Sequence, residues 1–438
     1  MMRKVLFLFC LIDATIIGAG AQLSPPSVGE LPPLTFKSEQ EPINLLIAKI
    51  AFSTIYNDNL LLNNMHPLED VSYEIRPGIS FQMARSRLRW VLDASPALIA
   101  HQQYVQRDLF NGTFGTTLEY QLTHHLMARF RGSFLITDNP FHDVPGNQVS
   151  GAPPNFFDTG TGFIITPQVK RTAGQAEADL SYELGPRTTV QVSGSFYHLQ
   201  FNDVATGTSD NLTTSQFANG RTLYSHRLSR RHSAGIIYSF QDLATFGTQP
   251  VRAITNTFLY SHSVEFTRST TLQMFAGPEH SRITENLALP FLGGTLEIPV
   301  TSTGWSWAAG AMFGLVGRRN SLRASFRHQI QNGGGLPGIA HHTSGSLEFR
   351  RRLVVGWVGS ASIGYGDNTL IRLNSLKSST TSLLGGVSLR HKLGRDLWFD
   401  ARYDRVHQNG TGELSNRTGD ADRVTAALEY QFKTRLGQ

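Results

Sequence analysis

The chain has 438 residues, of which only 16% are charged, whereas a soluble globular protein carries about 25%. A mean hydropathy of −0.18 is too polar for a bundle of membrane helices, and the steady supply of aliphatic and aromatic residues excludes low-complexity disorder. The net charge of +6 comes from scattered arginines, which does not match the clustered basic patch of a nucleic-acid-binding protein. The composition favours many short strands in an unusual solvent.

Residues 1–21 are a predicted secretory signal peptide. Two basic residues near the start are followed by an apolar run from Val5 to Ile17, and Ala19-Gly20-Ala21 matches a cleavage site. The run is too short for an anchor that crosses about 30 Å of hydrocarbon. Cys10, the only cysteine, follows a bulky phenylalanine, which argues against lipidation.

Residues 22–47 contain five prolines and are expected to be a Pro-rich periplasmic linker. From 48 to 432 the sequence alternates with period two, the pattern of β-strands. In Ser321 to Gln331, for example, apolar and polar residues alternate almost without a break. About eighteen such runs of ~10 residues predict one closed antiparallel transmembrane β-barrel, with sixteen strands as the alternative count. Residues 433–438 form a C-terminal tail.

The connections are predicted to alternate between tight basic turns and long polar loops, as in barrels with periplasmic turns and extracellular loops. The tight turns include 84–87, 185–187, 229–232, 317–320, 350–352 and 394–396, and the long loops are 97–112, 137–166, 202–220, 287–303 and 366–380. A β-sandwich would need several cores and linkers between them. A β-propeller would bury both faces of its strands, so neither rival fits the alternation.

In a barrel of this size the apolar faces meet lipid and the polar faces line a lumen wide enough for water. The residues predicted to line the pore are Arg129, Arg131, Glu177, Asp179, Glu183, Arg323, Arg327, Arg350, Arg390, Asp400 and Arg402. The residues predicted to form aromatic girdles at the two membrane interfaces are Trp90, Trp305, Trp307, Tyr430 and Phe432.

The order of these charges along the chain has two interpretations. Acids gather at Glu177 to Glu183 and bases gather later, from Arg323 to Arg390. Facing each other across the lumen, they would create a transverse field that favours polar solutes such as sugars. Alternatively, they form salt bridges between neighbouring strands and fix the strand register.

The long segment 137–166 could be a constriction loop, a sugar-binding or adhesive loop, a mobile cover or a plain solvated loop. No catalytic, cofactor-binding or metal-binding motif stands out. His124-His125 is expected at a turn and His341-His342 at a loop end, and the His-Glu-x-x-His spacing is absent. We therefore expect neither an enzyme nor a cofactor.

Two stretches resemble known sequences. Tyr56-Asn57-Asp58-Asn59, followed by Arg76-Pro77-Gly78-Ile79-Ser80-Phe81, resembles the opening of the β-barrel porin family found with bacterial exopolysaccharide clusters. The end, Thr425-x-Ala427-x-x-Tyr430-x-Phe432, is similar to the signal read by the barrel-assembly machinery, although Ala427 stands where Gly is usual and a tail follows. The resemblance implies an outer-membrane pore linked to polysaccharide export.

The sequence thus predicts a bacterial outer-membrane barrel that passes small hydrophilic solutes or carbohydrate. The alternative is a non-conducting barrel whose loops bind polysaccharide or other cells. Expected partners are outer-membrane lipid and lipopolysaccharide, the barrel-assembly machinery and a polysaccharide, with no nucleic acid.

Overall fold

The computed structural model describes residues 44–60, 62, 64–104, 109–138, 141, 169–202, 212–247, 250–291, 294–333, 336, 338–371, 378–415 and 417–435. The predicted signal peptide, most of the predicted linker 22–47 and residues 436–438 of the tail lie outside these ranges.

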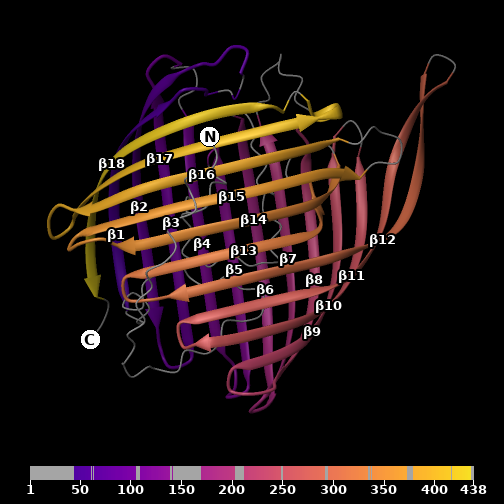
Figure 1. Cartoon of the computed structure of the whole chain (residues 1–438), viewed down its shortest axis with the longest axis horizontal. Helices are drawn as coiled ribbons and strands as arrows, with labels where there is room; N and C mark the ends of the chain where they lie inside the picture. Colours follow the sequence, from indigo (N-terminus) through magenta and orange to yellow (C-terminus); the bar gives the residue numbers. More distant parts are fainter. Residues whose placement is uncertain are drawn as a thin grey trace, which may run out of the picture.

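Eighteen antiparallel strands form one sheet that closes on itself (Figure 1). The strands are β1 Leu45–Asn57, β2 Asp70–Ala84, β3 Leu88–His101, β4 Leu109–Gln121, β5 Leu126–Thr137, β6 Lys170–Gly185, β7 Thr188–Asn202, β8 Thr214–Arg227, β9 His232–Phe246, β10 Val251–Thr267, β11 Thr270–Phe291, β12 Gly294–Val316, β13 Asn320–Asn332, β14 Ile339–Arg352, β15 Trp357–Ile371, β16 Ser379–Lys392, β17 Leu397–Thr411 and β18 Gly419–Arg435. Each strand pairs with its neighbours in sequence, and β1 pairs with both β2 and β18. The predicted eighteen-stranded closed barrel is confirmed.

The barrel has a turn end and a loop end. Leu45 of β1 pairs with Arg435 of β18, so both ends of the strand series lie at the turn end. Eight short connections of two to four residues lie there, and nine connections lie at the opposite, loop end. The turn predicted at 350–352 is displaced, because β14 runs through Arg352 and the turn is 353–356.

The predicted strict alternation of tight and long connections fails at two places on the loop end. β11 and β12 run through the predicted loop 287–303 as one long hairpin, and only residues 247–250 join β9 to β10. The strands also extend into the predicted loops 97–112, 202–220 and 366–380. Figure 1 shows the β11–β12 hairpin projecting past the rest of the barrel.

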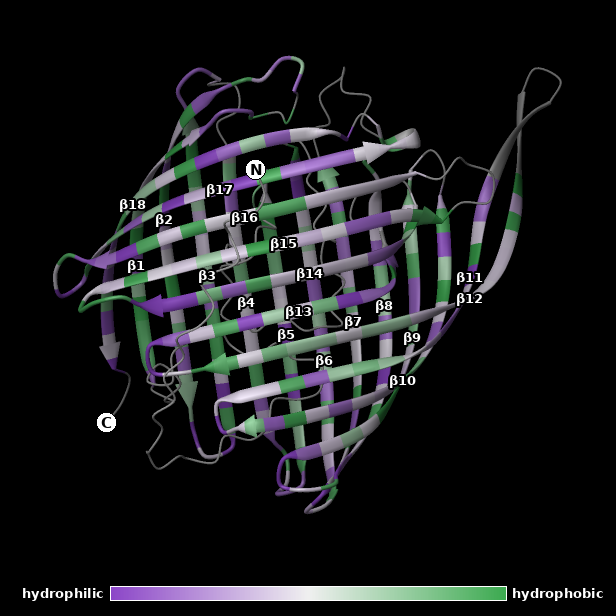
Figure 2. Ribbon diagram, in the orientation of Figure 1, coloured by the Kyte–Doolittle hydropathy of each residue, from purple (hydrophilic) through white to green (hydrophobic). Residues whose placement is uncertain are grey.

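Successive side chains along each strand face opposite sides of the wall, because a strand has a side-chain period of two. Figure 2 shows the resulting alternation of hydrophobic and hydrophilic residues along the strands. The exposed series consists of large apolar residues such as Phe52, Ile363 and Leu428, which are roughly half exposed. The opposite series contains buried polar and charged residues such as Glu74 and Asp404. An apolar outer surface of this extent needs a lipid environment.

No helix within the described ranges is long and apolar enough to cross a bilayer.

Candidate functional site

The barrel interior is the candidate functional site, since the predicted pore-lining residues point there. Ten of the eleven are buried or half-buried: Arg129, Arg131, Glu177, Asp179, Arg323, Arg327, Arg350, Arg390, Asp400 and Arg402. Glu183 differs, because it lies exposed beside the turn 186–187. Lining of a conducting pore stays a prediction for all eleven.

The first charged group joins β5, β6 and β8. The Arg131 guanidinium lies 3.3 Å from carboxylate oxygens of both Glu177 and Asp179. Arg221, which sequence reasoning missed, reaches the same two carboxylates at 3.9–4.0 Å. Gln191 also donates its Nε2–H to Asp179 at 3.0 Å. Two bases and two acids therefore share one buried network.

A second charged group joins β17 and β18. The Arg402 Nε and the Arg423 Nη2 donate to the two oxygens of Asp404 at 2.7 and 2.8 Å. Asp404 is fully buried, so its charge depends on these two partners. Nearby, Arg323 pairs with Glu348 at 3.5 Å and Arg390 pairs with Glu429.

These contacts bear on the two interpretations of charge order. Arg131 lies opposite Glu177 in the β5–β6 register, Arg323 opposite Glu348 and Asp404 opposite Arg423. The acids of β6 thus face bases from nearby strands on their own side of the wall, instead of Arg323 and Arg390 across the lumen. These contacts are those of register-fixing salt bridges, and a transverse field across the lumen stays a prediction. We call these paired side chains of β5–β8 and β13–β18 the charged band.

The interior also holds an apolar cluster that sequence reasoning did not predict. It comprises Ala173, Tyr197, Leu199, Phe217, Leu243, Val251, Ala253, Ile283, Ile330 and Ile339, and we call it the inner apolar cluster. Its members come from β6–β11 on one side and from β13 and β14 on the other. Since β13 is not a sheet neighbour of β6–β11, the outer end of the β13–β14 hairpin lies against the inner surface of the opposite strands.

The wall splits where this hairpin turns inward. Pairing between β12 and β13 runs only from Val316–Ser321 to Ala309–His328, while β13 stays paired with β14 to its end. Beyond this point the amide of Ile330 donates to the Glu279 carboxylate at 3.1 Å, and Ser306 donates to the same oxygen at 3.1 Å. A buried side chain of β11 therefore replaces the missing strand neighbour of β13.

The tip of the hairpin is fastened on the far side. The hydroxyl of Thr213, next to β8, donates to the carbonyl of Leu336 at 2.7 Å. Leu336 also packs with Ala340, Leu370 and Leu414, which brings the β13–β14 and β17–β18 connections together at the loop end. These ordered, largely apolar contacts narrow the lumen at the loop end.

Most of the predicted loop 137–166 lies outside the described residues, but one of its side chains is informative. Phe141 is fully buried against Leu384, Val406 and Ala421 of β16–β18. The Arg423 guanidinium lies 4.4 Å from the centre of its ring. This contact joins the connection after β5 to the charged band on the far strands.

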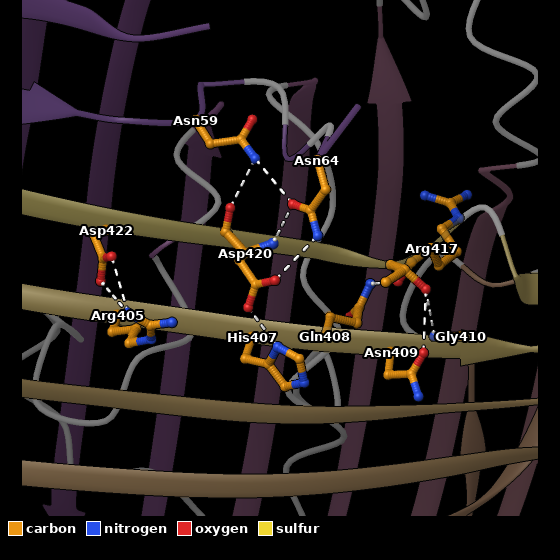
Figure 3. Close-up of polar contacts among 11 residues, drawn as sticks. Asn59, Asn64, Arg405, His407, Gln408, Asn409, Gly410, Arg417, Asp420 and Asp422 are labelled. Atoms are coloured by element: carbon orange, nitrogen blue, oxygen red, sulfur yellow. Dashed lines mark hydrogen bonds and ion pairs between the residues drawn. The ribbon is translucent and has the colours of Figure 1, made fainter. Parts of the chain in front are cut away.

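The stretch Tyr56-Asn57-Asp58-Asn59 has a structural role at the loop end of the β1–β18 seam. Figure 3 shows Asn59 and Asn64 from the β1–β2 connection converging on Asp420 of β18, with His407 of β17 on its other side. Asn59 donates to the Asp420 carbonyl at 2.8 Å, and the Asn64 amide exchanges hydrogen bonds with Asp420 at 2.9 and 3.0 Å. Asp58 accepts from the amide of Asp422 at 2.7 Å. These bonds fasten the first connection to the last strand.

The predicted girdle residues lie on the outside of the barrel. Trp305, Trp307, Tyr430 and Phe432 are exposed, with Trp305 at 75%. Trp307 stacks on His328 at 4.0 Å. Trp90 is half-buried and donates to Thr116 at 3.0 Å.

The two histidine pairs differ from each other. His124-His125 forms part of the exposed turn 122–125. His341-His342 lies inside β14, where His342 is buried against Asn368. Within the described residues, no group of three or more His, Cys, Asp or Glu side chains could hold a metal ion.

No family model and no curated protein matches the chain. Among solved structures, Pseudomonas aeruginosa OpdK with vanillate is 10% identical, with a TM-score of 0.40 over 89% of this chain and 99% of that one. P. aeruginosa OpdQ is 11% identical, with a TM-score of 0.40 over 89% and 98%. P. aeruginosa OpdO is 12% identical, with a TM-score of 0.40 over 90% and 99%.

Proposed function

We propose that this protein is a bacterial outer-membrane pore for the passive passage of small hydrophilic solutes. One observation carries the proposal: the outer surface is apolar while the charged band lies on the inner surface of the same strands. Ionised side chains facing the bilayer midplane would each cost about 2–4 kcal/mol, so the band has to face away from lipid, as it would around an aqueous interior. An eighteen-stranded barrel is wide enough to hold one.

The route runs past the charged band instead of the inner apolar cluster. Near Asp404 both signs of charge lie within a few ångströms of each other, which suits small zwitterionic or polar solutes more than apolar ones. Because the acids and bases are paired, only a weak preference for anions or cations is expected.

The test is planar-bilayer conductance of the refolded full-length protein. Discrete current steps are expected. Under a salt gradient the reversal potential should stay close to zero, because neither anions nor cations are strongly preferred. A protein that inserts into the bilayer without passing current would refute the pore. The variants Arg323→Glu and Arg327→Glu test the role of the interior charge. Arg323 pairs with Glu348, so reversing the charge at position 323 should shift the ion selectivity toward cations.

The second candidate is a non-conducting surface barrel whose loops bind polysaccharide or other cells. The inward hairpin favours it, since Ile330 and Leu336 fill part of the lumen. A link to exopolysaccharide export rests on the resemblance of residues 56–59 and 76–81 alone. Loss of surface polysaccharide in a deletion strain, restored by the wild-type chain, would support that link. Lipopolysaccharide and the barrel-assembly machinery are the partners that outer-membrane placement implies.

A further inference from the structure

The turn end of the barrel carries a concentrated positive charge. The eight turns are 85–87, 122–125, 186–187, 228–231, 268–269, 317–319, 353–356 and 393–396. They contain nine arginines, Arg85, Arg87, Arg187, Arg230, Arg231, Arg268, Arg318, Arg319 and Arg395, and a single acid, Asp396. Nine positive charges and one negative charge leave a net +8, which exceeds the +6 of the whole chain.

These arginines are available to a partner. All nine are exposed, and within the described ranges none forms an ion pair with a carboxylate. The strand ends add further exposed bases, Arg227, Arg351, Lys392, Lys433 and Arg435. Glu183 is exposed at the same end, so the acids there are few but present. Guanidinium groups bind phosphate with two parallel hydrogen bonds, and an unpaired ring of them attracts polyanionic surfaces.

The same turns also expose apolar side chains. Leu228 precedes Arg230-Arg231, Leu393 precedes Arg395, and the turn 353–356 consists of Leu353, Val354, Val355 and a glycine. Val355 is fully exposed and Val354 is 67% exposed. Leucine and valine beside arginine fit the boundary between headgroups and acyl chains, where apolar side chains enter the lipid and bases reach the phosphates. A soluble acidic protein would match the charge but would have no general need for these apolar tips.

We propose that this turn rim, the eight turns with their nine arginines, binds the headgroups of anionic phospholipids in the leaflet that surrounds the turn end. The proposal rests on the membrane placement given under Proposed function, but it does not depend on conduction. The turns lie all around one end of a closed barrel, so the rim contacts many lipids at once and its weak individual contacts add. Since the contacts are exposed, they weaken as salt is added.

The experiment compares the full-length protein in vesicles of phosphatidylcholine with vesicles that also contain phosphatidylglycerol. We expect phosphatidylglycerol to slow urea-induced unfolding by about tenfold or more at low salt, and by less at high salt. In the rim variant Arg230→Gln, Arg231→Gln, Arg318→Gln, Arg319→Gln and Arg395→Gln, which keeps four of the nine arginines, this effect should fall to less than half of that in the wild type.

The matched control replaces two exposed arginines at the loop end, Arg252→Gln and Arg282→Gln, and should keep the phosphatidylglycerol effect. A rim variant with the wild-type effect would overturn the proposal and leave the arginines to a soluble acidic partner. The absence of any effect in the wild type would overturn it too. Conductance measured on the same vesicles separates this outcome from failure of the pore, because the rim variant should conduct like the wild type.

Discussion

The charged band and the inner apolar cluster occupy the same interior but are built in opposite ways. In the band, Asp404 is held by two arginines at 2.7 and 2.8 Å, and each partner comes from the same or the adjacent strand. In the cluster, Ile330 of β13 packs on strands that are not its neighbours in the sheet. Contacts between strands at most two apart in the sheet therefore account for the band, whereas the cluster depends on a hairpin leaving the wall.

The difference separates two tasks. In the proposed pore, paired charges keep water inside the barrel and permit polar solutes to pass. Packed aliphatic side chains exclude water and close the space that they occupy. Each task can be removed without the other, so substitutions in the two regions should have different signatures.

The largest effect is expected from Ile330→Asp. An unpaired carboxylate in the inner apolar cluster costs roughly 3–5 kcal/mol, which is enough to release the outer end of the β13–β14 hairpin. Single-channel conductance should then rise clearly above that of the wild type. Unchanged steps in a correctly folded variant would show that the hairpin does not restrict the lumen.

A disulfide supplies the control for this variant. The hydroxyl of Thr213 donates to the backbone carbonyl of Leu336 at 2.7 Å, so the two residues lie close together, and Thr213→Cys with Leu336→Cys is the crosslink to form. Cys10, the only natural cysteine, belongs to the predicted signal peptide. Oxidised, the pair should hold the hairpin tip and restore small steps to Ile330→Asp, and a reductant should reverse this.

Asp404→Asn is the corresponding test of the charged band. The change leaves Arg402 and Arg423 without their shared carboxylate and adds net positive charge to the interior. We expect reversal potentials to shift toward anion selectivity, together with a loss of stability of about 3–5 kcal/mol. Asp422→Asn is the matched control, because Asp422 pairs with Arg405 on the exposed series of the same two strands. Equal shifts of the reversal potential in Asp404→Asn and Asp422→Asn would show that the charged band does not set the ion selectivity.

Sequence reasoning predicted the fold because the period of two holds over almost every strand. It also assigned each charged residue to one side of the wall, since parity needs no knowledge of the neighbours. It could not pair them, because Arg131 and Glu177 become partners only through the β5–β6 register. Arg221 was missed because it follows directly on the predicted loop 202–220, whereas β8 already begins at Thr214.

The inward hairpin was beyond sequence reasoning for a different reason. Ile330 belongs to the same alternating series as Phe326, which is exposed, and only the split between β12 and β13 gives it a buried environment. The prediction of a loop at 287–303 failed in a related way. Pro299 lies within it, in a part of β12 that pairs with β11 alone, and proline is tolerated at such an edge.

Phe141→Ala tests an apolar contact that reaches the charged band. The ring packs on Leu384 and Val406 beneath the Arg423 guanidinium, so its loss should loosen the connection after β5. We expect noisier currents and a smaller rise in conductance than in Ile330→Asp. Phe141→Leu keeps most of the packing and should behave nearly like the wild type. A larger rise in conductance in Phe141→Ala than in Ile330→Asp would show that the Phe141 contact restricts the lumen more than the hairpin does.

The smallest effect is expected where the geometry looks strongest. Arg252 holds Asp242 through two hydrogen bonds of 2.6 and 2.9 Å, distances close to those within the charged band. Its side chain is 62% exposed, however, so water competes for both charges and the pair contributes only about 0.2–1 kcal/mol. A double-mutant cycle with Arg252→Ala and Asp242→Ala, measured by urea-induced unfolding, should return a coupling free energy in that range. A cycle on Arg423 and Asp404 should return a coupling free energy several times larger, because Asp404 is buried and water does not compete for its charge. Equal coupling energies would mean that distance, and not burial, sets the strength of these pairs.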